Sequence, residues 1–109
     1  MIAVKVDGVL ECGDPEGPIK IAWLISLSTV EKVVIVDDNY RKVWSRADLG
    51  GHMLPAYILG ESLRDRLRNI RRFFKEERYI FIGPESDRAD AEAEGFTYIP
   101  PEKFMEVVP

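Results

Sequence analysis

The sequence is poor in the residue types that build disulfide or metal frameworks. It contains one cysteine, Cys12, and one histidine, His52. A single cysteine cannot form an internal disulfide, and one cysteine with one histidine cannot supply the usual ligand spacings of a zinc site. Such cysteine usage is typical of a reducing compartment, so we expect a cytoplasmic location.

Long apolar runs are missing as well. No stretch approaches the roughly 18 consecutive apolar residues of a membrane-spanning helix. The apolar start, residues 1–7, has no basic leader and predicts a strand rather than a signal peptide. We therefore expect no membrane partner.

Glutamine is absent and asparagine occurs twice, whereas 31% of the residues are charged. Depletion of amides together with enrichment of charge is typical of proteins from thermophiles. Hydrophobic residues make up 46% of the 109 positions, which is enough for one domain, 1–109, with its own core.

Strands and helices are predicted to alternate along the chain. Short runs rich in β-branched and aromatic residues predict strands at 2–6, 32–36, 79–82 and 96–99. Helices are predicted at 19–27, 39–46, 62–77 and 86–94. A further strand at 56–59 is plausible, although Pro55 argues against a central position for it. The alternation predicts a three-layer, Rossmann-like α/β domain with four or five mostly parallel strands, in which 2–6 and 32–36 are neighbours.

The helix predicted at 62–77 has the clearest pattern. Ser62 is an N-cap candidate, and one apolar face at helical spacing is expected to be buried. That face consists of Leu63, Leu67, Ile70, Phe73 and Phe74. The chain has a net charge of −4, but residues 62–78 carry seven basic and three acidic side chains, which leaves −8 for the remainder.

The basic side chains of this helix lie off its apolar face: Arg64, Arg68, Arg71, Arg72 and Lys75. A solvated face is the simpler interpretation, and a nucleic-acid or anion surface is the alternative. Aromatic side chains that could stack on bases are not expected on this face, so nucleic acid is an unlikely partner.

Acidic residues follow three of the predicted strands: Asp7, Asp37 with Asp38, and Asp87. Carboxyl ends of parallel strands meet at one edge of a sheet, so these side chains are expected to converge there. Three or four carboxylates could hold Mg²⁺. Alternatively they only form turns and helix caps, and Lys5 pairs with Asp7 or Asp37 in place of a metal.

Two of these strand ends resemble motifs of the haloacid-dehalogenase-like (HAD-like) phosphohydrolases. Residues 5–10, Lys-Val-Asp-Gly-Val-Leu, resemble the family's first motif, Asp-x-Asp-Gly-(Thr/Val)-Leu after a strand. Residues 83–95, from Gly-Pro-Glu-Ser-Asp to Gly95, resemble its last motif. The resemblance implies a HAD-like fold and Mg²⁺ as cofactor, with Asp7 and Asp87 as the metal ligands that match the family's pattern.

The same resemblance fails at the positions that carry the chemistry. Lys5 replaces the nucleophilic Asp, and an ammonium group cannot form an acyl-phosphate. Asp37 stands where the family has a Thr or Ser that binds phosphoryl oxygens, and Pro84 replaces a metal-binding Asp. Arg64 is the nearest candidate for the basic residue of the third motif, and the family's cap domain is absent.

A weaker resemblance links residues 6–13 to the mannose-type sugar-phosphotransferase IIB domains. Cys12 would stand where those domains have a phosphorylated His, but the Arg and His of their motif are both missing.

Two classes of function follow from the sequence. The first is a small, capless HAD-like domain without phosphatase activity that binds a partner or a small anion or regulates another protein. The alternative is a magnesium-dependent phosphohydrolase with a divergent site. The degenerate site would consist of Lys5, Asp7, Asp37, Asp38 and Asp87. The sequence identifies no ligand or partner and leaves homo-oligomerisation open.

Overall fold

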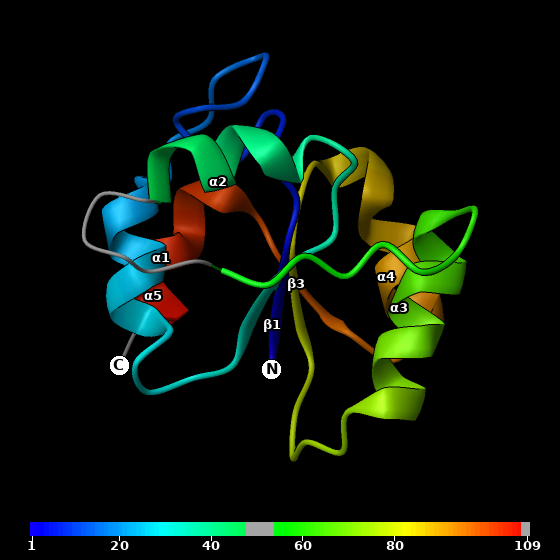
Figure 1. Cartoon of the computed structure of the whole chain (residues 1–109). Helices are drawn as coiled ribbons and strands as arrows, with labels where there is room; N and C mark the ends of the chain where they lie inside the picture. The colour runs from blue at the N-terminus through cyan, green and yellow to red at the C-terminus, as the bar shows by residue number, and fades with distance from the viewer. Residues whose placement is uncertain (48–53, 108–109) are drawn as a thin grey trace.

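Four short strands form one parallel sheet in the computed structural model, which describes residues 1–47 and 54–107 (Figure 1). The strands are β1 (Ile2–Val4), β2 (Val33–Ile35), β3 (Ile80–Ile82) and β4 (Thr97–Ile99). Their order across the sheet is β2-β1-β3-β4. The predicted parallel α/β architecture and the pairing of the first two strands are therefore confirmed.

The register of the sheet aligns the side chains of neighbouring strands on the same face. Ile2 pairs with Val33 of β2 on one side and with Ile80 of β3 on the other. Successive side chains of a strand point to opposite faces, so each three-residue strand contributes side chains to two separate hydrophobic cores. Ile2 and Val4 belong to one core, whereas Ala3 belongs to the other.

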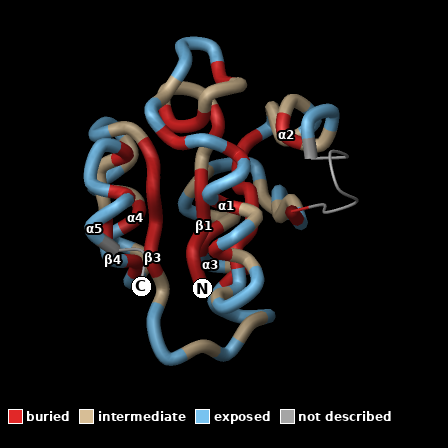
Figure 2. Tube along the Cα trace, turned by 90° about the vertical axis from the view of Figure 1, so that its left-hand side faces the viewer, coloured by how far each residue is buried: buried red, intermediate tan, exposed pale blue. Residues whose placement is uncertain are grey.

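Helices cover both faces of the sheet within the described residues. One face carries α1 (Ile21–Leu27), α2 (Tyr40–Ala47) and α5 (Phe104–Val107), and the other carries α3 (Leu63–Phe73) and α4 (Arg88–Ala93). Two 3₁₀ helices, η1 (Glu85–Asp87) and η2 (Pro101–Lys103), precede α4 and α5. Figure 2 shows the resulting gradient, with β1 and β3 buried and much of the outer loops exposed. None of the helices in the described part of the chain combines the length and apolar character needed to cross a membrane.

Helix α3 departs from the prediction at its C-terminal end. Ser62 caps its start by accepting a hydrogen bond from the Asp65 backbone N–H at 3.1 Å, as predicted. The helix ends at Phe73, four residues earlier than predicted, because Phe74 adopts an extended conformation. Leu67 and Ile70 are buried, but Phe73 is 63% exposed, so the prediction that Phe73 is a core residue is wrong.

Helical periodicity stops where the helix stops. The extended Phe74 turns toward Tyr57, with ring centroids 5.6 Å apart, and Lys32 Nζ lies 5.0 Å from its ring. Phe74 and Leu63 pack against the core of this face while remaining partly exposed.

The strand predicted at 56–59 is reduced to a single parallel bridge between Ala56 and Ile35. The Ile35 N–H donates to the Pro55 carbonyl at 2.8 Å, and the Tyr57 N–H donates to the Ile35 carbonyl at 2.7 Å. Pro55 has no N–H for a longer ladder, so the segment only covers the outer edge of β2. His52 lies outside the described residues.

Candidate functional site

The strand order places a switch point between β1 and β3. The chain moves from β1 outward to β2 and then crosses back to β3 on the other side of β1. Doubly wound sheets bind ligands at such a point, beyond the carboxyl ends of the strands. In Figure 1 these ends lie at the top, beneath α2 and the loop that follows β1. The residues directly after β1 and β3 are Lys5 and Gly83.

A backbone hydrogen bond holds Lys5 at this point, and the absence of a side chain at Gly83 leaves room for the Lys5 side chain. Its N–H donates to the Ile82 carbonyl at 3.0 Å. A Cβ atom added to Gly83 would lie 2.5 Å from the Phe81 ring and 3.2 Å from Lys5 Cγ. Glycine at this position therefore makes room for the Lys5 stem. The side chain is 23% exposed, and its Nζ lies 4.0 Å from Asp37 Oδ2.

Asp37, directly after β2, is the only buried charged side chain among the described residues. Its Oδ2 accepts the backbone N–H groups of Val6 at 2.9 Å and Asp7 at 3.4 Å, and its Oδ1 accepts that of Asn39 at 3.0 Å. Burial alone would raise the pKa of Asp37. The hydrogen bonds and the Lys5 charge outweigh burial and hold the pKa below its ordinary value. Asp37 thus ties the chain after β1 to β2.

Asp7 holds a different set of groups. Its carboxylate accepts the Asp14 backbone N–H at 2.9 Å and the Asn39 side-chain amide, and Lys42 Nζ lies 3.5 Å away. These partners come from the loop after β1 and from the start of α2. Asn39 and Lys42 were not predicted as site residues, although their spacing places both on the first turn of a predicted helix.

Asp87 follows β3, which lies on the other side of β1 from the strand that precedes Asp37. It closes η1 at the start of α4, and no hydrogen bond to its carboxylate is present within the described residues. Partial burial raises the pKa of Asp87; Lys5 opposes this shift, while Asp90 and Asp37 add to it. The Lys5 charge therefore lowers the pKa of two carboxylates, although their overall shifts are opposite. We call Lys5, Asp37 and Asp87 the Lys5 cluster.

The structure places Asp7, Asp37 and Asp87 at the carboxyl ends of the strands, as the sequence predicted, but Asp38 makes a separate contact. Asp38 points away from the Lys5 cluster and pairs with Arg66 at 2.7 Å, with a side chain that is 76% exposed. Within residues 1–47 and 54–107, no three His, Cys, Asp or Glu side chains form a group that could hold a metal ion.

The donors around the acids bear directly on a Mg²⁺ site. The oxygens of Asp7 and Asp37 already accept protein N–H groups, and an ammonium group stands beside Asp37. Mg²⁺ needs free oxygen ligands in octahedral geometry. With Lys5 in place, these residues do not fit Mg²⁺.

Cys12 lies in the loop after β1. Partial burial raises the pKa of its thiol, while Arg46 and Lys42 oppose that shift. The neighbouring Glu11 accepts the Ile21 N–H at 2.7 Å at the start of α1. A raised pKa disfavours the thiolate, which is the nucleophilic form.

The chain was compared with known proteins at three levels. No family model matches it, and neither the curated proteins nor the solved structures contain a match.

Proposed function

We propose that this chain is a non-catalytic domain of the HAD-like type, which acts by binding rather than by transferring phosphoryl groups. The observation that carries this proposal is the position of Lys5. Its ammonium group occupies the switch point 4.0 Å from Asp37, where the first motif of the family has its nucleophile.

The arrangement of the strands supports the HAD-like part of the proposal. The two stretches that resemble the family, 5–10 and 83–95, begin directly after β1 and β3. These strands are hydrogen-bonded neighbours in parallel. Motifs that are far apart in the sequence therefore meet at one edge of the sheet, as a shared site requires.

The chemistry supports the non-catalytic part. An acyl-phosphate forms only on a carboxylate, and Lys5 offers an amine whose charge is balanced by Asp37. Asp37 stands where a phosphoryl group would need hydrogen-bond donors, and its negative charge repels phosphate. Its oxygens are also committed to the Val6 and Asn39 N–H groups.

A phosphatase assay tests this proposal. The native chain should not hydrolyse p-nitrophenyl phosphate above the buffer blank with Mg²⁺ or Mn²⁺ present. Lys103→Ala, which removes an exposed cation on η2, is the control for a change in charge alone. Turnover that requires Mg²⁺ and is lost in Lys5→Ala but kept in Lys103→Ala would establish the alternative, a magnesium-dependent phosphohydrolase with a divergent site.

A further inference from the structure

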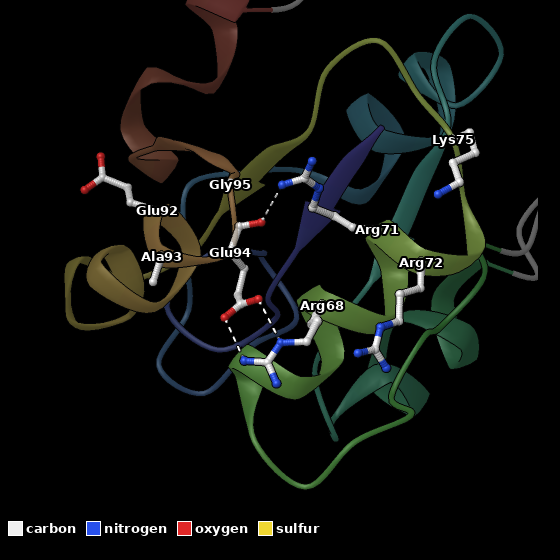
Figure 3. Close-up of a pocket in the computed structure, with 8 residues that line it drawn as sticks. All are labelled: Arg68, Arg71, Arg72, Lys75, Glu92, Ala93, Glu94 and Gly95. Atoms are coloured by element: carbon white, nitrogen blue, oxygen red, sulfur yellow. Dashed lines mark hydrogen bonds and ion pairs between the residues drawn. The ribbon is translucent and has the colours of Figure 1, made fainter.

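A basic groove lies on the opposite side of the sheet from α1, between α3 and the end of α4 (Figure 3). The groove is shallow and open to solvent, with a volume of about 450 Å³. The groove is lined by Arg68, Arg71, Arg72, Lys75, Glu92, Ala93, Glu94 and Gly95. Four of these eight side chains are cationic and two are acidic.

Both acids of the groove are already paired with arginines. Glu94, with a side chain only 9% exposed, accepts hydrogen bonds from Arg64 and Arg68 at 3.1 Å. Glu92 pairs with Arg88 at 3.4 Å. Arg64 and Arg88 lie outside the groove lining, whereas Arg68 belongs to it and is committed to Glu94, which leaves Arg71, Arg72 and Lys75 as the groove's remaining cations.

Arg71 is held in a fixed position across the groove. Its Nη1 donates to the Glu94 carbonyl at 3.1 Å, as the dashed line in Figure 3 marks, and its guanidinium lies 5.0 Å from the Tyr79 ring centroid. Gly95 has a φ of +84°, and a Cβ atom there would collide with Arg71 Nη1. Glycine at position 95 therefore serves both the end of α4 and the placement of Arg71.

Arg72 and Lys75 have no ion pair within residues 1–47 and 54–107. Together with Arg71 they leave an unbalanced positive charge in a concave surface. Like charges held near one another repel, and a multivalent anion relieves that repulsion. Guanidinium groups match phosphate oxygens in bidentate geometry, and a Lys ammonium adds a mobile point charge.

We propose that the basic groove binds a small ligand that carries two or more adjacent phosphate groups. Single-stranded nucleic acid is the less suitable occupant, since it needs open aromatic faces as well as cations. Arg71 covers Tyr79, and the exposed Phe73 contacts Tyr57 rather than the groove. This proposal is independent of the non-catalytic role of Lys5, because the two sites share no residue.

Titration calorimetry of the native chain with inorganic triphosphate, pyrophosphate and orthophosphate tests the proposal. Affinity should rise with the number of phosphate groups. The double variant Arg72→Ala/Lys75→Ala should bind triphosphate at least tenfold more weakly, which corresponds to about 1.4 kcal/mol. Arg41→Ala/Lys103→Ala removes one Arg and one Lys that are exposed on α2 and η2, and it should bind within twofold of the native chain.

Gly95→Ala provides a second test that leaves every charge in place. It should weaken triphosphate binding because the new Cβ displaces Arg71, provided that circular dichroism shows a folded chain. The proposal is overturned if the native chain binds no triphosphate, or if both double variants lose affinity equally. It is also overturned if a single-stranded RNA oligonucleotide binds more tightly than triphosphate and competes with it.

Discussion

The switch point of the sheet and the basic groove both concentrate charge, but only the first balances it internally. In the Lys5 cluster, the ammonium group lies 4.0 Å from Asp37 and its charge also acts on Asp87, and Asp37 accepts backbone N–H groups. In the basic groove, Glu92 and Glu94 are already paired, so no acid of the lining is left to balance Arg71, Arg72 and Lys75. Internally balanced charge holds loops and strands together, whereas unbalanced charge in a concave surface is suited to a ligand from outside.

The largest effect on stability is expected on the buried face of α3, the helix that lines the basic groove. Leu67→Ala should lower the free energy of unfolding by about 2–5 kcal/mol, because a fully buried side chain leaves a cavity beneath α3. Phe73→Ala, on the same helix but 63% exposed, should cost less than about 1 kcal/mol. Chemical denaturation measures both. Equal losses would mean that α3 does not pack through Leu67.

The next largest effect on stability is expected from the loss of charge balance between Asp37 and Lys5 at the switch point. Asp37→Ala should cost about 2–4 kcal/mol, because the Val6 N–H loses its acceptor and Lys5 loses its counter-charge. Asp38→Ala is the matched control one residue later, and its exposed pair with Arg66 should contribute less than about 1 kcal/mol. If urea midpoints shift equally in both variants, Asp37 is not a structural link.

A smaller effect is expected in the pH dependence of stability, which should differ in sign between Asp37 and Asp87. The folded-state pKa of Asp37 lies below the ordinary value of about 3.9, so its stabilisation is complete above that value and is lost as the pH falls through the folded pKa. The folded-state pKa of Asp87 lies above the ordinary value, so its ionisation costs stability at neutral pH and the cost disappears in acid.

Thermal melts between acidic and neutral pH distinguish these two signs. Asp87→Asn should raise Tm slightly at neutral pH, and the gain should vanish in acid. Asp37→Asn should lower Tm at neutral pH, and this loss should shrink on acidification. The same sign for both variants would contradict the opposite pKa shifts.

The order of the strands and helices could be predicted from the sequence, but the ends of the helices and the side-chain pairs between distant residues could not. Alternation of β-branched runs with helical spacing predicted the parallel sheet and the neighbouring β1 and β2. Periodicity continued through Phe73 and gave no sign of the extended Phe74 that ends α3. Local patterns detect repeating side chains, whereas the end of a helix depends on what packs beyond it.

The candidate site shows the same limit. From the sequence, Lys5 was expected to pair with either Asp7 or Asp37. In the structure it pairs with Asp37, whose Oδ2 also accepts the Val6 N–H directly after Lys5. The basic groove needs Glu94 and Gly95, which directly follow α4, beside Arg71, across more than 20 residues of sequence. The run of arginines was visible in the sequence, but the acids that neutralise part of it were not assignable.

The most direct test of the account is a Mg²⁺ titration of the native chain beside Lys5→Ala, with calorimetry as the readout and Lys42→Ala as control. Lys5 is the cation of the Lys5 cluster and pairs with Asp37, whereas Lys42 pairs with Asp7 outside this cluster. We expect no saturable binding by the native chain or Lys42→Ala, and millimolar or tighter binding by a less stable Lys5→Ala, since a divalent ion can replace the lost ammonium group. Saturable Mg²⁺ binding by the native chain, or no change in either stability or Mg²⁺ affinity in Lys5→Ala, would contradict the account.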